Sequence, residues 1–495
     1  MNRKILLAAV LLCALTAPAY SSTFKEQLAA LPGVVSIDEV VQDEQVVREK
    51  YIVWFEQPID WARPDVGTFL QRVKIAFQDY DRVNMFYTNS RELSTSRLHA
   101  DERPEIAKMY DANSIAVEYR FYDKSIPAGL SKDKPDLWEH LTNENASKDF
   151  HNIIEQLKGI LSGRWVVGGA GNAVNVFSHY FPNDAEAYVS YYPVFCDGQN
   201  DSRFFDAVYT TIGDEYYGAE QAKTYRDMLL ELQVEAIRNR DYLQPRMFSA
   251  DVKPRTFGNV SMDFDVSVIE YPISVWQYNQ NFASVDAILK MPRNDDPTTE
   301  TNEREEYLAA MLELINVGDS SDDPILFPYI VQTALENGNY GLVTKYLRTA
   351  LEREGLSMYM TEEDARDYFL KTIFTEEQYR RFKYDPSLRN EMLNWAHTTQ
   401  SNVIITYATS NPWYFVRLPD VYDNPNVHIF KVNTFQNMNI QNMPDEQKAE
   451  ITALLDEWLT NDAETPSTSS SSNCNAGFSF CGVIAALLVL VRRRI

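Results

Sequence analysis

The residues best placed to do chemistry lie in a sharp turn at 168–172, which reads Gly-Gly-Ala-Gly-Asn between a strand-like run and a helix-like run. Glycine loses much backbone entropy on folding, so three glycines in one turn require a structural reason. Two chemistries use such a turn: a loop whose backbone N–H groups bind phosphate, and a nucleophile elbow that lifts a serine above a sheet. A packing turn without chemistry is the third interpretation.

The phosphate-binding interpretation fits poorly. A G-x-G-x-x-G pattern starting at Gly169 would need a third glycine at Val174, and no acidic residue ends the next strand-like run at 188–192 to hold a ribose. The elbow pattern G-x-S-x-G fits the spacing and context, except that Ala170 stands where the serine belongs and Asn172 replaces the second glycine. The turn alone leaves an altered elbow and a packing turn open.

The elements around the turn alternate between strand and helix patterns. Strand-like runs interleaved with helix-like runs predict a mostly parallel sheet with helices on its faces. The strand-like runs are 51–55, 83–87, 114–119, 165–167, 188–192, 403–407 and 428–432, and the helix-like runs include 146–161, 173–180 and a last helix that ends near residue 459.

The middle of the chain is mainly helical, and Thr375 to Gln378 form a capping-box pattern that opens a helix. The simplest architecture is one α/β sheet built from both ends of the body, with a helical cap inserted between them. We expect a first core part at 20–204, the cap at 205–395 and a second core part at 396–460.

Both ends of the chain predict export. Residues 1–19 contain Arg3 and Lys4, a short apolar run and an Ala-Pro-Ala site, which is typical of a signal peptide cleaved after Ala19. Residues 461–495 comprise a Ser-rich spacer, an apolar run at 478–491 and three arginines. That run spans roughly 21 Å as a helix, short of a bilayer core of roughly 30 Å. It resembles bacterial C-terminal sorting tails, which implies a transient membrane tether, sorting or processing machinery, and a cell-surface or extracellular location; a simple tail anchor is the alternative.

Composition excludes several partners and cofactors. The chain carries 71 acidic and 46 basic residues, a formal charge of −25, which disfavours nucleic-acid binding. Cys196 is the one cysteine between the predicted signal peptide and tail, so an internal disulfide or a cysteine-based metal site is not expected. The acidic run 319–323 lacks EF-hand spacing and reads as a solvated loop. We expect no cofactor and no metal.

Segments at 31–34, 55–60, 67–72, 86–88, 117–122, 136–138 and 276–278 carry a resemblance that runs in order over roughly residues 30 to 440. In these segments the chain is similar to the secreted bacterial serine aminopeptidases that remove tri- and tetrapeptides, often after proline. The resemblance implies an α/β-hydrolase core with a helical cap and a Ser-Asp-His triad.

All three triad positions depart from that family. Ala170 replaces the serine of the family's Gly-Gly-Ser-Lys-Gly-Gly, and Asn411 replaces the aspartate of its Asp-Pro-Trp. The family's Asn-His-Gly-Ala-Asn-Ile corresponds to residues 434–440, where Gln436 is the best match for the histidine and Asn437 the next. Ala170 has no attacking oxygen, the Asn411 amide carries no charge to stabilise an imidazolium, and Gln436 does not exchange protons near neutral pH.

These replacements predict an exported member of the family that lacks peptidase activity and binds a peptide or protein ligand in the remnant cleft, or serves as an interaction protein. The alternative is an active secreted aminopeptidase or other hydrolase with a nucleophile not identified from the sequence. Binding of a surface polymer is a third hypothesis.

Two charged residues are candidates for ligand binding. Glu118 and Arg120 lie in a segment that matches the family, at the carboxyl end of a strand-like run, where sites form in α/β sheets. We expect Glu118 to bind a peptide's amino terminus and Arg120 to pair inside the core; a buried ion pair that holds the sheet is the alternative. The segment 88–91 departs from the family's Thr-Ser-Gly-Tyr, which argues against residual catalysis.

Overall fold

The computed structural model describes residues 22–42, 45–88, 90–93, 101–130, 135–248, 259–292, 301–315, 326–436 and 439–460. The predicted signal peptide and C-terminal tail lie outside these described residues. Within them, no helix has the length and apolar character needed to cross a membrane.

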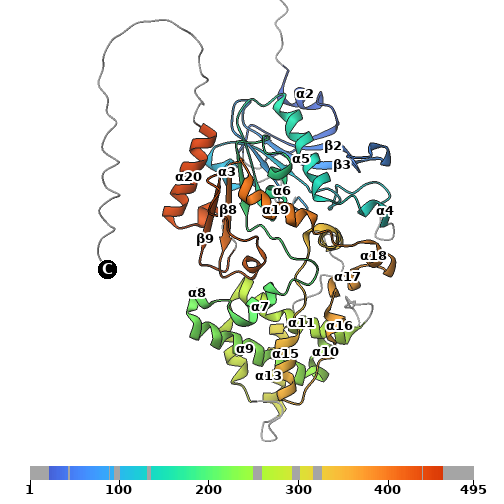
Figure 1. Ribbon diagram of the computed structural model, residues 1–495, viewed down its shortest axis with the longest axis vertical. Helices are drawn as coiled ribbons and strands as arrows, with labels where there is room; N and C mark the ends of the chain where they lie inside the picture. Colours follow the sequence, from blue (N-terminus) through green and yellow to red (C-terminus); the bar gives the residue numbers. More distant parts are fainter. Residues whose placement is uncertain are drawn as a thin grey trace, which may run out of the picture. The chain divides into compact units, whose positions relative to one another are not determined.

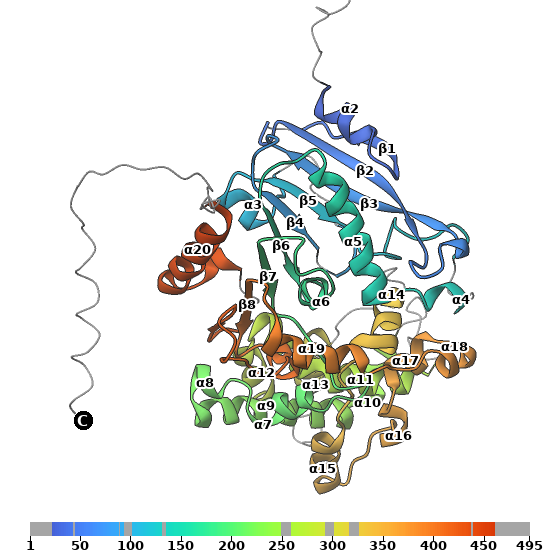
Figure 2. The same ribbon diagram turned by 45° about the horizontal axis from the view of Figure 1, so that its top comes forward.

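Nine strands of the described residues form one sheet in the order β1-β2-β3-β5-β4-β6-β7-β8-β9 (Figures 1 and 2). The first three strands are antiparallel to their neighbours, and the strands from β5 to β9 run parallel to one another. The bounds are β1 (Val34–Glu39), β2 (Glu49–Pro58), β3 (Thr68–Phe77), β4 (Asn84–Tyr87), β5 (Asn113–Val117), β6 (Trp165–Ala170), β7 (Ala187–Tyr191), β8 (Val403–Ala408) and β9 (Val427–Val432).

Helices cover both faces of this sheet, and every residue of β7 and β8 is therefore buried. Val166 and Val167 of β6 point to opposite faces and join different hydrophobic clusters, as the strand period of two requires. One face is covered by α2 (Phe24–Ala29), α5 (Asn143–Lys158), α6 (Ala173–Tyr180) and α19 (Ser387–Thr398), and the other by α3 (Glu105–Met109) and α20 (Asp445–Thr460).

A mainly helical segment is inserted between β7 and β8 and has its own aromatic core, which includes Phe204, Trp276 and Leu347 (green to orange in Figure 1). Its elements are α7 (Arg203–Thr210), α8 (Asp214–Tyr217), α9 (Ala219–Arg238), α10 (Arg240–Met247), α11 (Val260–Ser274), η2 (Val275–Asn279), α12 (Phe282–Leu289), α13 (Thr301–Ile315), α14 (Leu326–Gln332), η3 (Thr333–Asn337), α15 (Lys345–Arg353), α16 (Glu362–Ala365), α17 (Tyr368–Ile373) and α18 (Glu376–Arg381). Short elements elsewhere are η1 (Pro64–Val66), α4 (Pro135–Trp138), η4 (Pro412–Val416) and η5 (Ile440–Asn442).

The predicted mostly parallel sheet with an inserted helical cap is confirmed, and Thr375 does open α18 with a capping box. The hydrophobic clusters refine the cap's extent. Phe327 and Phe374 of the inserted segment belong to the core cluster beside the sheet rather than to the cap's own cluster. Helix α19 begins within the predicted cap, yet it contacts α6 and places Trp395 in the core cluster.

Candidate functional site

The turn after β6 has the tight geometry that an elbow needs. A Cβ added at Gly169 would lie 1.5 Å from the Thr88 carbonyl oxygen, so the close approach of β4 and β6 admits only glycine there. Gly171 has φ of 81°, a left-handed conformation that favours glycine. The contact at Gly169 and the dihedral angle at Gly171 are the structural reasons for these two glycines. Ala170 lies between them, at the end of β6 and before α6.

A serine from a neighbouring loop contacts the tip of this turn. Ser90 follows β4, has φ of 63°, and its Oγ donates a hydrogen bond to the Ala170 carbonyl oxygen at 3.1 Å. A Cβ at Gly171 would also meet Ser90 Oγ at 3.1 Å. The Ser90 hydroxyl therefore lies beside the position where a nucleophile would stand, and its proton is committed to a backbone carbonyl.

The predicted acid position is occupied by Asn411, whose side-chain oxygen and nitrogen both form hydrogen bonds. Asn411 follows β8 and is 3 % exposed. Its Oδ1 accepts a hydrogen bond from the Trp413 N–H at 3.0 Å, and its Nδ2 donates to the Phe435 carbonyl oxygen at 2.8 Å. An N–H partner on one side and a carbonyl on the other fix the orientation of the amide. Asn411 thus ties the loop after β8 to the loop after β9.

The loop after β9 turns its aromatic residue inward and its amide outward. Phe435 is 3 % exposed and packs with Tyr216, Tyr217 and Trp276 of the cap, with ring centroids 5.0–5.7 Å apart. Gln436 is exposed, and its backbone N–H donates to Thr434 Oγ1 at 3.4 Å. Asn437, the second candidate for the histidine position, lies outside the described residues.

The three replaced positions share one edge of the sheet. β6, β8 and β9 run in the same direction, so Ala170, Asn411 and Gln436 all follow carboxyl ends on that edge. Asn411 contacts the residue next to Gln436 directly, whereas β7 separates β6 from β8, a spacing of about 10 Å between strand axes. The structure therefore joins two of the three loops by a hydrogen bond and places the third on the same edge.

Glu118 is enclosed and saturated with partners. It is 0 % exposed; Arg72 Nη2 and the Leu93 N–H donate to Oε1 at 2.5 and 3.0 Å, while Ser125 Oγ donates to Oε2 at 2.7 Å. Burial raises the pKa of Glu118, and these partners act against that shift. A role in binding a peptide's amino terminus stays a prediction, and it would require Glu118 to be released from Arg72.

Arg120 is paired inside the core, as one of its two predicted roles requires. Its Nε and Nη2 donate to the two carboxylate oxygens of Asp149 at 2.8 and 2.9 Å, and both side chains are 0 % exposed. Nη1 donates to the carbonyl oxygens of Ile59 and His140, both at 2.8 Å. This bidentate pair connects the segment after β5 to α5, and it offers no free donor on those nitrogens to a ligand.

No alternative nucleophile and base stand together in the described part of the chain. Its histidines contact carboxylates or aromatic rings: His140 with Asp60, His151 with Asp184, His179 with Glu391, His397 with Asp423, and His428 with Trp458. Burial raises the pKa of the Cys196 thiol far above its ordinary value, which keeps it in the unreactive protonated form.

A cap segment contacts the helix that follows the elbow. Asn337 Oδ1, at the end of η3, accepts hydrogen bonds from Asn172 Nδ2 at 3.0 Å and from Asn143 Nδ2 at 2.8 Å. Glu336 Oε2 accepts from the backbone N–H and from Nδ2 of Asn143 at 2.7 and 2.8 Å. Burial raises the pKa of Glu336, and no ion pair joins it to a cation of the described residues. A carboxylate without a counter-cation thus lies near the elbow. Sequence patterns did not reveal Glu336 as a site residue, because its hydrogen-bond partner Asn143 is 193 residues away in the chain.

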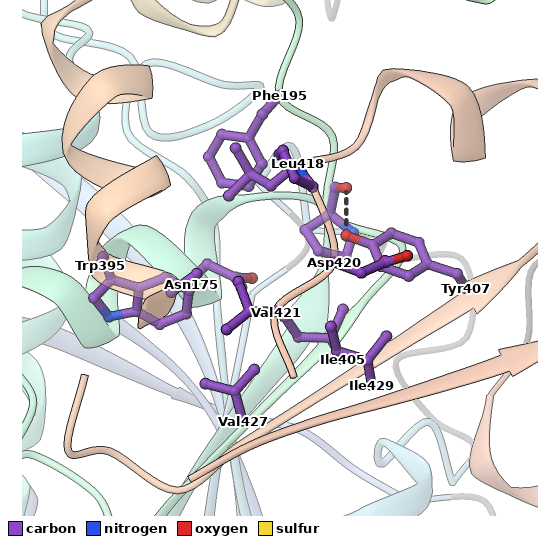
Figure 3. Close-up of a pocket in the computed structure, with 13 residues that line it drawn as sticks. Asn175, Phe195, Trp395, Ile405, Tyr407, Leu418, Asp420, Val421, Val427 and Ile429 are labelled. Carbon is purple, nitrogen blue, oxygen red and sulfur yellow. Dashed lines mark hydrogen bonds between the residues drawn. The ribbon is translucent and has the colours of Figure 1, made fainter. Parts of the chain in front are cut away.

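A small apolar cavity lies between α6, α19 and the strands β8 and β9 (Figure 3). Its free volume of about 10 Å³ is the room of roughly one water molecule, too small for a peptide. The dashed line in Figure 3 is the hydrogen bond from the Tyr407 hydroxyl to the Pro193 carbonyl oxygen, at 3.4 Å. Asn175 lines the cavity at 1 % exposure, and neither of its side-chain polar atoms has a hydrogen-bond partner.

The strand order and the tight turn between β6 and α6 define the chain as an α/β-hydrolase. Residues 17–305 match the family model of PS-10 peptidase S37, and the chain belongs to this peptidase family. The family resemblance found in the sequence is therefore confirmed.

The chain is also similar to individual proteins. A prolyl tri/tetrapeptidyl aminopeptidase from Streptomyces mobaraensis is 25% identical over 412 residues, which cover 81% of this chain and 76% of the relative. Among solved structures, the haloalkane dehalogenase DatA from Agrobacterium tumefaciens matches at 11% identity with a TM-score of 0.29, covering 82% of this chain and 96% of that one. A lipase-like protein from Acinetobacter baumannii matches at 7% identity and a TM-score of 0.28, covering 90% and 100%.

Proposed function

We propose that this chain is an exported member of the peptidase S37 family that does not hydrolyse peptides and instead binds a peptide or protein ligand. The observation that carries the proposal is Ala170 in the tight turn between β6 and α6, where an elbow would carry its serine. A methyl group offers no electron pair to a carbonyl carbon, so the acyl-enzyme step of serine hydrolases has no nucleophile. Triad removal in another serine protease slows the reaction by about 10⁶-fold.

Ser90 is the residue that the rival proposal, an active hydrolase, must use. Ser90 is partly exposed, and its Oγ donates a hydrogen bond to the Ala170 carbonyl oxygen at the elbow. The other hydroxyl that contacts the elbow, Ser190 Oγ, donates to the Gly171 carbonyl oxygen and is 0 % exposed. Activation of a serine requires an adjacent base, and no hydrogen bond joins a histidine of the described residues to Ser90. These contacts support the proposal over its rival.

Labelling with a fluorophosphonate, followed by intact mass measurement, separates the two proposals. We expect no adduct on this chain under conditions that label the Streptomyces mobaraensis aminopeptidase fully. An adduct that disappears in a Ser90→Ala variant would establish Ser90 as the nucleophile and reject the proposal.

Ligand binding is supported by Glu336, a carboxyl group that forms no ion pair with a cation of the described residues and whose pKa is raised by burial. The relative's name describes an enzyme that acts on peptides with an amino terminus, and an ammonium group is the natural partner of such a carboxylate.

We expect unblocked tripeptides to raise the melting temperature, because a ligand that binds only the native state stabilises it. Glu336→Gln should weaken this effect about tenfold in ligand concentration. The control Glu354→Gln removes an exposed carboxylate paired with Arg238 and should leave the effect unchanged.

Export rests on residues 1–19, and surface sorting on residues 461–495. Mass spectrometry of protein recovered from the exporting cell tests both. We expect an N-terminus at or near Tyr20 and a C-terminus shortened or modified near Cys474. An intact chain of 495 residues would reject both parts.

A further inference from the structure

Three potential metal ligands lie close together in the α/β core. None of them takes part in the contacts described at the elbow. His151 and Glu155 lie one turn apart on the same face of α5, and Asp184 lies in the segment between α6 and β7. One nitrogen of His151 and one carboxylate oxygen from each acidic residue all lie within 4.8 Å of one another.

Small side-chain movements would bring the three donor atoms to the spacing of a transition-metal site. Zinc binds imidazole nitrogen and carboxylate oxygen at about 2.0–2.2 Å in tetrahedral geometry, which places donor atoms roughly 3.3–3.5 Å apart. His151 Nδ1 and Asp184 Oδ2 are 2.7 Å apart. The Glu155 side chain is half-exposed, so a rotation about its own bonds closes the remaining distance.

Two of the ligands are already held in place. The His151 ring stacks on Phe181, with centroids 4.2 Å apart and planes 11° apart, which fixes the direction of Nδ1. The Asp184 side chain is 7% exposed, so its carboxylate is presented from a buried position. Pre-positioned ligands lower the ordering entropy lost on binding.

A cation already stands between the two carboxylates. Lys158 Nζ lies 2.9 Å from Glu155 Oε1 and 3.9 Å from Asp184 Oδ1. Lysine is a flexible point charge, and this one is exposed enough to swing into solvent. The ammonium therefore occupies the charge position that a metal ion would take, and it competes with a metal for the same oxygens.

We propose that His151, Glu155 and Asp184 form a binding site for a divalent transition-metal ion, with zinc the first choice, which displaces the Lys158 ammonium. An imidazole ligand favours zinc, copper or nickel over magnesium and calcium. Three protein ligands leave a fourth position for water. The ion would connect α5 to the segment that leads into β7 and stabilise the core. The sequence predicted no metal because the ligands come from separate segments and match no motif.

The test titrates ZnCl₂ into the folded chain, prepared without a polyhistidine tag, by calorimetry and by thermal denaturation. We expect one zinc per chain and a rise in melting temperature. His151→Ala should weaken zinc at least tenfold, as should Glu155→Gln, whose half-exposed position keeps the fold intact. Lys158→Gln should tighten zinc several-fold, because it removes the competing cation.

His397→Ala is the matched control. His397 also contacts a carboxylate, Asp423, at 2.9 Å, but no third ligand from the described part of the chain joins that pair, so zinc binding should be unchanged. The proposal is overturned if wild-type chain binds no zinc, if Glu155→Gln and His151→Ala bind it as tightly as wild type, or if Lys158→Gln weakens it.

Discussion

Asn411 Nδ2 donates a hydrogen bond to the Phe435 carbonyl oxygen at 2.8 Å. An ionised aspartate at this position would have no proton to donate there. The Asn411 amide therefore ties the loop after β8 to the loop after β9. The same residue, Phe435, buries its ring among cap aromatics, so this tie also supports the contact between core and cap.

Replacing Asn411 with an aspartate should destabilise the protein. Asn411→Asp places a buried charge against a carbonyl oxygen, and we expect a loss of about 1–3 kcal/mol at pH 7. Burial and the facing carbonyl raise the pKa of the introduced carboxyl, so its protonated form is favoured in the folded state. The folded state then binds the proton more tightly, and the loss shrinks towards pH 4 and grows as pH rises.

Urea denaturation of wild type and variant at pH 4 and pH 7 measures this difference. Asn394→Asp, at an exposed position of α19, is the control and should change stability by less than about 0.5 kcal/mol at either pH. An Asn411→Asp variant as stable as wild type at pH 7 would show that the tie contributes nothing.

Arg120 and Asp149 should behave as a structural ion pair. Arg120→Met leaves the Asp149 carboxylate buried and unpaired, and we expect a loss of about 3–5 kcal/mol by urea denaturation. The double variant Arg120→Met with Asp149→Leu should recover much of that loss. Arg63→Met removes an exposed partner of Asp60 and should cost at most about 1 kcal/mol. Loss of ligand binding by Arg120→Met without loss of stability would instead support the binding role predicted from the sequence.

Asn175 is a polar group that the core does not satisfy. Asn175→Leu keeps the number of side-chain heavy atoms and replaces an unpartnered amide beside the apolar cavity. We expect a gain of about 1–2 kcal/mol, since a buried amide without partners is penalised by its lost hydration. Thermal and urea denaturation check this, with Asn394→Leu on the surface of α19 as control. A clear loss of stability would mean that the amide makes contacts in solution that the apolar side chain does not replace.

Local patterns predicted much of the fold, while the assignment of Ala170, Asn411 and Gln436 to the triad positions stays a prediction. The apolar run before the glycines and the helix at 173–180 were visible in the sequence, and α6 has those bounds. β1 and β3 were not predicted. β1 is a half-exposed edge strand, and β3 contains Arg72, whose charge interrupts the apolar pattern.

Long-range pairing explains what the sequence did not reveal. Arg72 is buried because Glu118, 46 residues away, neutralises it, and that same pairing encloses the predicted ligand-binding carboxylate. Glu336 contacts Asn143, 193 residues earlier, and its neighbour Asn337 contacts Asn172 of the turn, 165 residues earlier. Such contacts form only in the folded chain, so the spacing of residues along the sequence does not predict them.

Hydrolysis of an unblocked tripeptide–proline substrate decides whether this chain is an active peptidase. With Ala170 at the elbow, release of the tripeptide should be indistinguishable from the rate without protein, while the Streptomyces mobaraensis aminopeptidase turns the substrate over under the same conditions. Turnover that stays with this chain through purification and is lost in Ser90→Ala would contradict the account, because it would place a working nucleophile beside Ala170.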